Sequence, residues 1–154
     1  MRKIILFLLL SLGVVGSTQA ADMVFEASAS IPLDKAYDKV YKALEDRQLW
    51  VVFEANIGKN LSGFAERWGK DYNQQELEGI RSMVFCNAWY ANRVSNLDPS
   101  MLALCPQRLT ITHKQGSSTV LFIRPSLIAG DSPAKSVLLE LEKEVIAAIR
   151  EGLK

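Results

Sequence analysis

The sequence is poor in the residues that usually build crosslinked scaffolds or metal centres. Among its 154 residues there are only two cysteines and one histidine. Two cysteines exclude a scaffold held together by many disulfides. Zinc needs four nitrogen or sulfur ligands, or three and a water, and the two cysteines and His113 would supply three only if all of them converged. We therefore expect no metal site and no metal cofactor.

The chain also lacks an excess of charge of either sign. It has 18 Lys and Arg residues against 17 Asp and Glu residues, which gives a formal net charge of +1. This balance creates no field that would attract nucleic acid or an anionic membrane, and basic and aromatic residues do not interleave in a nucleic-acid pattern. With 49% hydrophobic residues, no repeat and no linker, the composition predicts one ordinary folded domain.

Common catalytic signatures are missing as well. No G-x-S-x-G or H-E-x-x-H motif occurs, and residues 63–70 have the wrong glycine spacing for a phosphate-binding loop. A Ser-His-Asp triad would have to use His113, and nothing in the sequence places a nucleophile near it. Glu54 is expected to be a solvated strand residue rather than an acid or a base. These absences favour a protein without catalysis of its own.

The only long hydrophobic run lies at the N-terminus. Arg2 and Lys3 precede an apolar stretch over residues 4–15, and small residues follow up to Ala20. This order is typical of a secretory signal peptide, and a run of about 12 residues falls short of the roughly 20 that span a bilayer. We expect cleavage after Ala20, with Ala21 as the alternative cut, so that residues 21–154 form the mature domain.

Removal of this segment would lower the formal net charge from +1 to about −1, because Arg2 and Lys3 go with it. No later stretch is apolar enough to cross a membrane. We therefore expect an exported, soluble protein of the bacterial periplasm. The alternative is an N-terminal segment that stays attached as an anchor.

The mature chain alternates between strand-like and helix-like segments. Apolar runs and alternation predict strands over residues 23–29, 49–57, 80–86, 108–113 and 118–124, the last two joined as a hairpin. Apolar side chains at helical spacing predict long amphipathic helices over residues 33–47 and from residue 133 to near Gly152, with short helices over 61–68 and 87–96. Residues 70–78 and 125–132 are expected to be mainly loop.

Each long helix has a single apolar stripe, which must be buried against another layer. We therefore predict an α+β fold of two layers, in which a mixed or antiparallel sheet is covered on one face by the two long amphipathic helices.

The predicted strand 49–57 has apolar residues on both faces. Alternation predicts that its core face carries Val51, Phe53 and Ala55, and that the opposite face carries Trp50, Val52 and Glu54. Because Trp50 and Val52 make the second face partly apolar, this face is compatible with a dimer contact or a ligand pocket.

The two cysteines are expected to form a disulfide. Cys86 ends the strand 80–86, and Cys105 precedes Pro106 and the hairpin. An exported chain with a small, even number of cysteines usually pairs them. Closing a loop of about 20 residues would contribute roughly 3 kcal/mol to stability. A reactive thiol pair and two independent buried thiols are the alternatives.

A contact surface for a ligand or partner is expected beside Cys86. Trp89 follows Asn87 at a strand-to-helix turn, where backbone N–H groups are free to meet an anion or a carbonyl. We expect Cys86, Asn87 and Trp89, with the nearby sheet, to form this surface. For the Trp89 side chain itself, packing in the core is the favoured interpretation, and contact with a ligand or partner is the alternative.

Several short segments resemble a known family, the domain of unknown function family 302. The segments are Leu49-Trp50-Val51-Val52-Phe53-Glu54 after the helix 33–47, then Phe85-Cys86-Asn87, Leu97-Asp98-Pro99 and Leu104-Cys105-Pro106. The resemblance covers residues 23–153. It departs from the usual pattern at Ala88, where the family tends to have proline, and at Cys105, which stands before a proline rather than after one.

The resemblance implies a compact two-layer α+β domain that often associates as a dimer, and it brings no established reaction or cofactor. Together with the residues, it predicts an exported, non-catalytic binding or accessory protein whose partner is a small molecule or another periplasmic protein. A homodimer is compatible with the resemblance. The alternatives are a thiol-redox or metal-handling protein that uses Cys86 and Cys105, and a structural dimer module.

Overall fold

The sheet at the centre of the molecule is antiparallel throughout. The computed structural model describes residues 23–154, so the predicted signal segment 1–20 and its cleavage site lie outside the described residues. Its five strands are β1 (Val24–Ala29), β2 (Trp50–Asn56), β3 (Gly79–Cys86), β4 (Gln107–Lys114) and β5 (Ser117–Ile123). They are arranged in the order β1-β5-β4-β3-β2, and every neighbouring pair runs antiparallel.

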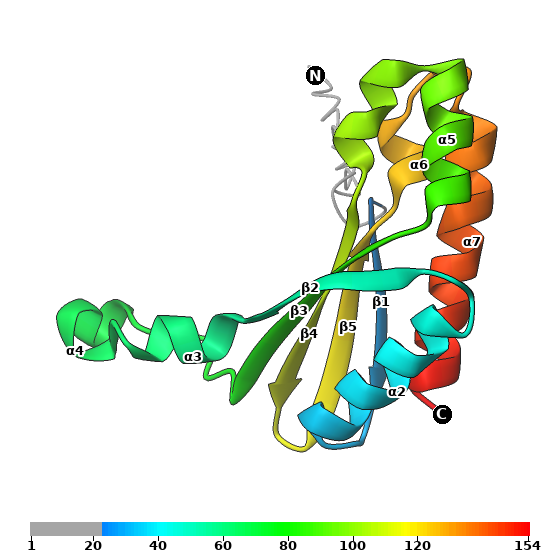
Figure 1. The fold of residues 1–154 in the computed structure, drawn as a ribbon. Helices are drawn as coiled ribbons and strands as arrows, with labels where there is room; N and C mark the ends of the chain where they lie inside the picture. Colours follow the sequence, from blue (N-terminus) through cyan, green and yellow to red (C-terminus); the bar gives the residue numbers. More distant parts are fainter. Residues whose placement is uncertain (1–22) are drawn as a thin grey trace, which may run out of the picture.

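Two long helices cover one face of this sheet, as the sequence predicted. These are α2 (Leu33–Glu45) and α7 (Lys135–Gly152), which lie side by side on one side of the strands (Figure 1). The other helical segments are α3 (Ile57–Ser62), α4 (Ala65–Trp68), α5 (Ala88–Leu97) and α6 (Pro125–Ile128), with 3-10 turns η1 (Gly69–Asp71) and η2 (Pro99–Leu104). The fold is therefore a two-layer α+β structure.

The core lies between the sheet and the two long helices. It is built from inward-facing strand residues and from the apolar stripes of the helices: Met83, Phe85, Leu109, Ile111, Val120, Phe122, Tyr37, Val40, Leu44, Val145 and Ile149. Each of these side chains is almost fully buried. Burial of one large apolar side chain contributes about 1.5–3 kcal/mol, so this layer supplies most of the driving force for folding.

Helices α2 and α7 approach closely at Gly152. A Cβ atom at this position would lie 2.7 Å from the Cα and N atoms of Val40. The absence of a side chain at Gly152 therefore allows the end of α7 to pack on the backbone of α2. Arg47 adds an ion pair beside this contact, with Nη2 at 2.6 Å from Glu151 Oε2.

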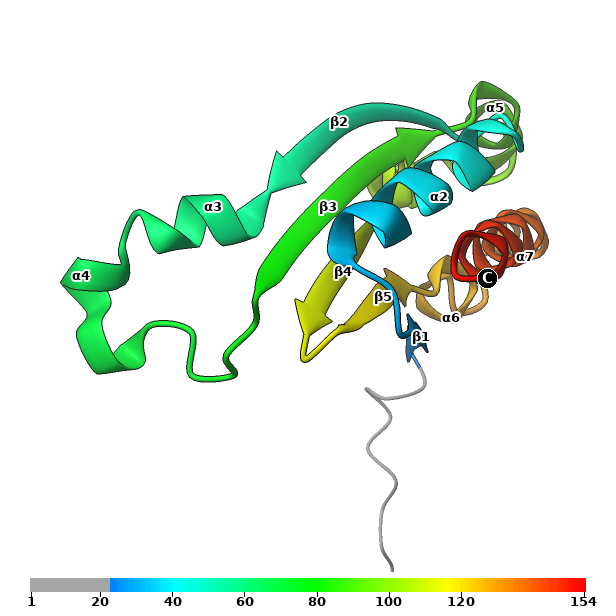
Figure 2. The same ribbon diagram turned by 90° about the horizontal axis from the view of Figure 1, so that it is seen from below.

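Residues 57–78 form an arm that the sequence predicted only in part. A short helix was expected over 61–68, but α3 begins at Ile57, directly after β2, because the Asn56 side chain accepts a hydrogen bond from the Lys59 N–H and caps the helix. Figures 1 and 2 show the arm extending away from the side of the sheet that carries α2 and α7. The segments η2 and α6 were not expected as helices, and each begins at a proline in its first turn.

The expected orientation of β2 is wrong beyond Val51. The pairing of β2 with β3 contains a β-bulge between Val51 and Phe53. A bulge inserts one residue into a strand, so the residues after it change faces. Phe53 therefore pairs with Val84 on the face without helices and is 61% exposed, whereas Glu54 pairs with Met83 and lies under α2.

Glu54 is exposed, as expected for a solvated strand residue, but it also belongs to a polar cluster that the sequence did not reveal. The buried Tyr37 of α2 donates its hydroxyl hydrogen bond to Glu54 Oε2. The guanidinium carbon of Arg81 lies 3.4 Å from the centre of the Tyr37 ring, and Arg81 Nη1 lies 3.2 Å from Asp34 Oδ1. A buried tyrosine needs a partner for its hydroxyl, and this cluster supplies one while it connects α2 to β2 and β3.

We expect Gly152→Ala to lower the free energy of unfolding by about 2 kcal/mol, because the new methyl group forces the two helices apart. Urea unfolding followed by circular dichroism measures this change. Gly63→Ala is the matched control, since a Cβ atom at Gly63 has only an ordinary contact, 3.5 Å from the Asn60 carbonyl oxygen. Equal stabilities of Gly152→Ala and wild type would contradict the close helix contact.

The Tyr37 cluster predicts a loss of stability at alkaline pH. Burial, and next the hydrogen bond to Glu54, raise the pKa of Tyr37 above its usual value of 10. The folded state therefore keeps the phenolic proton to a higher pH than the unfolded chain does. The resulting stability is fully present below about pH 10 and is lost as the pH rises toward the folded-state pKa.

We expect Tyr37→Phe to lower the free energy of unfolding by about 1 kcal/mol at pH 7, because one hydrogen bond is lost. We also expect its stability to fall less steeply than that of wild type above pH 10. Urea unfolding at a series of pH values tests both points. Tyr72→Phe removes the same atom from the arm and is the matched control. Parallel pH profiles for wild type and Tyr37→Phe would contradict the assignment.

Candidate functional site

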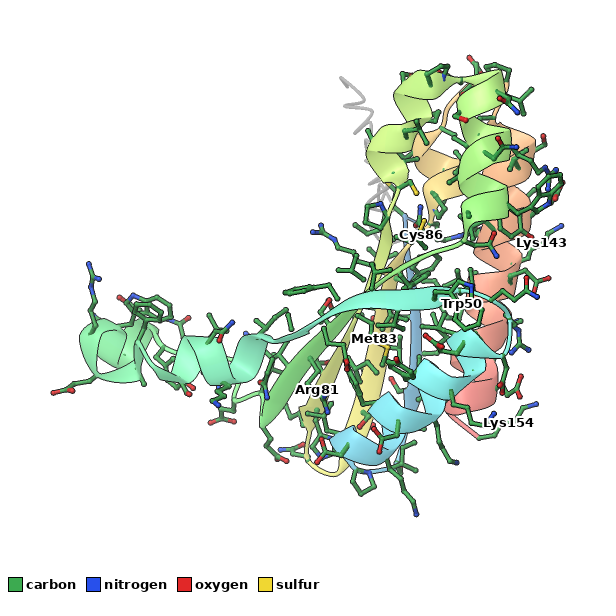
Figure 3. The ribbon with its side chains drawn as sticks, viewed as in Figure 1. Trp50, Arg81, Met83, Cys86, Lys143 and Lys154 are labelled. Carbon is green, nitrogen blue, oxygen red and sulfur yellow. The ribbon has the colours of Figure 1, made fainter. Side chains whose placement is uncertain are left out.

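The residues expected to form a site gather where β3 ends and α5 begins. Cys86 is the last residue of β3, Asn87 caps α5 and Trp89 lies in its first turn. Figure 3 shows Cys86 at the end of β3, beyond Arg81 and Met83. Cys105 is far away in the sequence, but the pairing of β3 with β4 continues to Phe85 and Gln107. This register brings Cys105 next to Cys86.

The two cysteines are in contact as free thiols. Their Sγ atoms are 3.4 Å apart, which is hydrogen-bond distance for sulfur and longer than the roughly 2.05 Å of a disulfide bond. The sequence therefore identified two cysteines that meet in space. The expected disulfide is not formed in this structure, and the pairing stays a prediction.

Burial affects the chemistry of Cys105. It raises the pKa of this thiol to about 11, and the hydrogen bond with Cys86 acts in the same direction. Catalytic thiols have lowered pKa values because the thiolate is the nucleophile. Cys105 is therefore a weak nucleophile toward an external molecule at neutral pH.

The space beside the thiols is apolar and small. It lies under α5 and is lined mainly by side chains from β3, α5, η2 and α7, among them Phe85, Tyr90, Val94, Leu104, Leu138 and Leu141. Its volume is about 20 Å³, which is room for roughly one water molecule. An organic ligand would have to displace side chains to enter it.

The start of α5 is not an open anion site. The Asn87 Oδ1 atom accepts hydrogen bonds from Trp89 N at 2.9 Å and from Tyr90 N at 3.1 Å. The Asn87 Nδ2 atom donates to the Gln48 carbonyl oxygen at 3.0 Å. The expectation of free N–H groups at this turn is therefore wrong, because asparagine is a strong helix cap that satisfies them itself.

Trp89 lies on the surface rather than in the core. Its side chain is 65% exposed, and the guanidinium carbon of Arg93 lies 6.0 Å from its ring centre. An exposed tryptophan is suited to a contact with another molecule. The role of Cys86, Asn87 and Trp89 in binding a ligand or partner stays a prediction.

Within residues 23–154, no three His, Cys, Asp or Glu side chains gather in a way that could hold a metal ion. His113 instead has Nδ1 at 2.9 Å from Ser118 Oγ, and its Nε2 lies 3.6 Å from Glu78 Oε2. None of the helices in this part of the chain combines the length and apolarity needed to cross a membrane.

The sheet face without helices was recognised from the sequence only at strand 49–57, where Trp50 and Val52 make the second face partly apolar. The strand pairings place on it three charged residues, Glu26, Arg108 and Lys114, and otherwise uncharged ones: Val24, Ser28, Trp50, Phe53, Ala55, Ile80, Ser82, Val84, Cys86, Thr110, Thr112, Ser117, Thr119, Leu121 and Ile123. We call these residues the open face. Trp50 is 53% exposed and Phe53 is 61% exposed. A sheet face in contact with water normally carries more charge than this one does.

The arm extends on the same side of the sheet as the open face (Figures 1 and 2). It carries a stacked aromatic pair, Phe64 and Trp68, whose ring centres are 5.0 Å apart. These side chains are 46% and 40% exposed. The open face and the arm together therefore present exposed aromatic groups away from the helical layer.

Comparisons with known proteins agree with this fold. A family model described as "Domain of unknown function DUF302" matches residues 25–152. None of the curated proteins compared with the chain is significantly similar to it. One similar solved structure is the crystal structure of an uncharacterized conserved protein DUF302 from Bacillus stearothermophilus.

That structure superposes with a TM-score of 0.73 at 16% sequence identity, over 86% of this chain and 98% of the other chain. The likeness at this identity shows the fold. The family model covers nearly all of the described residues, and the two-layer fold agrees with it. The chain therefore belongs to the DUF302 family, whose function is unknown.

Proposed function

We propose that this protein is an exported, non-catalytic binding module that acts as a homodimer, joined through the open face and the arm. The observation that carries the proposal is the low charge and the exposed aromatic residues of the open face. Export is supported by the order of the first 20 residues, in which positive, apolar and small residues follow one another. A macromolecular partner is favoured over a small ligand bound beside the thiols, because the space there is so small.

The arm supports the proposal because it has no core of its own. None of the residues in α3, α4 and η1 is buried. Helices of six and four residues are too short to be stable alone in water, so such segments depend on tertiary contacts. The exposed pair Phe64 and Trp68 provides apolar surface for these contacts. A partner that packs on the arm would supply them.

The size of the open face fits a dimer that also uses the arm. Five strands spaced ~4.8 Å apart, with ~7 residues of ~3.3 Å each, present about 550 Å². Two such faces would bury about 1,100 Å², slightly less than the ~1,200 Å² at which stable interfaces begin. The sheet faces alone are therefore marginal, and contacts from the arms bring the interface into the usual range.

A second copy of the chain would cover both the open face and the arm. In a two-fold dimer the same surface is used by both copies, so each arm can reach the open face of its partner. The open face carries both signs of charge, with Glu26 on β1 and Arg108 and Lys114 on β4. Two copies would therefore not be separated by charge repulsion.

We expect the purified protein to be a dimer at micromolar concentration in sedimentation velocity and in light scattering after gel filtration. Phe53→Ser on the open face and Trp68→Ser in the arm should each raise the dimer Kd about 30-fold or more, because a truncated aromatic at the centre of an interface costs about 2 kcal/mol or more.

Leu139→Ser is the matched control, because Leu139 is an exposed hydrophobic residue but lies on α7, in the helical layer on the other face of the sheet. This variant should remain dimeric. Circular dichroism checks that all three variants fold. A wild-type protein that is monomeric at about 100 μM, far above the Kd of a stable complex, would overturn the proposal. A dimer that survives both the Phe53 and the Trp68 substitution would overturn it too.

A further inference from the structure

We infer that Cys86 and Cys105 are a reversible thiol pair, which closes to an intramolecular disulfide by exchange with an external disulfide. The external reagent is a small-molecule or protein disulfide, and the product joins the end of β3 to the segment before β4. This inference does not depend on dimer formation. It concerns a modification site away from the arm.

The geometry supports closure within one chain. The two Sγ atoms are already 3.4 Å apart, so they need to approach by little more than an ångström to bond. Both residues are held in place by backbone hydrogen bonds. Cys86 pairs with Trp50 in the sheet, and Cys105 N donates to the Leu102 carbonyl oxygen at 2.9 Å. Both side chains are partly exposed, so an external disulfide can reach them.

The two cysteines are expected to have different roles in the exchange. The raised pKa of Cys105 makes it a weak nucleophile at neutral pH, which leaves Cys86 as the residue that attacks first. Cys105 then attacks the Cys86 sulfur atom inside the protein, where its position at van der Waals distance offsets its low thiolate population.

The reaction balances as two exchange steps. The Cys86 thiolate attacks one sulfur of RS–SR, which forms a mixed disulfide and releases RS⁻, and this product takes up the proton that Cys86 lost. The Cys105 thiol loses its proton to solvent and attacks the Cys86 sulfur, which releases a second thiolate that is protonated to RSH. Two protein thiols are oxidised to one disulfide, and the external disulfide is reduced to two thiols.

The disulfide would constrain the part of the chain that packs on α7. The loop between the two cysteines contains α5 and η2. This segment is held to α7 by a small separate cluster that includes Val94 and Leu138. A crosslink at the base of the loop would restrict its freedom in the unfolded chain. The oxidised protein should therefore unfold at a higher temperature than the reduced protein.

The experiment treats the purified protein with oxidised glutathione at pH 7.5 and measures intact mass after alkylation of the remaining thiols. We expect wild type to lose both alkylatable thiols without keeping a glutathione adduct, and reductant to restore both. Its melting temperature should rise by about 10 °C on oxidation. The double variant Cys86→Ser/Cys105→Ser is the control and should show no change of melting temperature.

The single variants test the order of attack. Cys105→Ser should accumulate one glutathione on Cys86, whereas Cys86→Ser should react at Cys105 about tenfold more slowly than an ordinary exposed thiol does. Three results would overturn the inference. They are two thiols that stay alkylatable in wild type, a glutathione adduct that persists in wild type, and crosslinking between chains in place of closure within one chain.

Discussion

Two long helices are too few to cover both faces of the five-stranded sheet, and this shortage shapes the molecule. Helices α2 and α7 have single apolar stripes and pack side by side on one face, where they bury the inward residues of β3, β4 and β5. Within residues 23–154, no helix covers the opposite face. Its side chains nevertheless include few charges and several exposed aromatic and aliphatic groups. This surface is less polar than a sheet face that stays in contact with water usually is. The arm lies next to it.

The features that the sequence predicted well are those with strong periodic contrast. The stripes of Leu33 to Leu44 and of Val137 to Ile149 have polar residues between them, so the two long helices were recognised nearly to their ends. The hairpin of β4 and β5 was recognised because its two alternating strands are separated by only a short turn. These patterns were enough to predict the two-layer architecture.

The alternation of polar and apolar residues is unclear in the segments where the sequence prediction was wrong. Residues 50–53 are all apolar, so alternation cannot reveal that a bulge at Val52 exchanges the faces of Phe53 and Glu54. Tertiary contacts determine which way these side chains point, because Glu54 accepts a hydrogen bond from the hydroxyl of the buried Tyr37 on α2. The arm was hard to recognise for a related reason. Its helices are short, bury nothing and begin at an asparagine cap inside an apparent strand.

At the candidate site the sequence correctly indicated that Cys86 and Cys105 meet, and Asn87 lines the same small space as the two cysteines. The sequence could not show that Asn87 satisfies the amides of the turn, although asparagine directly before a helix is a recognised cap signal. It also could not show how little space lies beside the thiols, since cavity size depends on how side chains from four elements pack. The outer surface of the sheet is therefore a stronger candidate for a binding surface than a buried pocket beside the thiols.

The central claim is that the arm is completed by a second copy of the chain. Hydrogen exchange followed by mass spectrometry tests it most directly, with backbone amides of residues 57–78 measured over a range of protein concentrations. If the account is right, these amides are protected at high concentration and exchange rapidly after dilution, while the strands β4 and β5 in the core stay protected throughout. Protection of residues 57–78 that does not change with concentration would contradict the account.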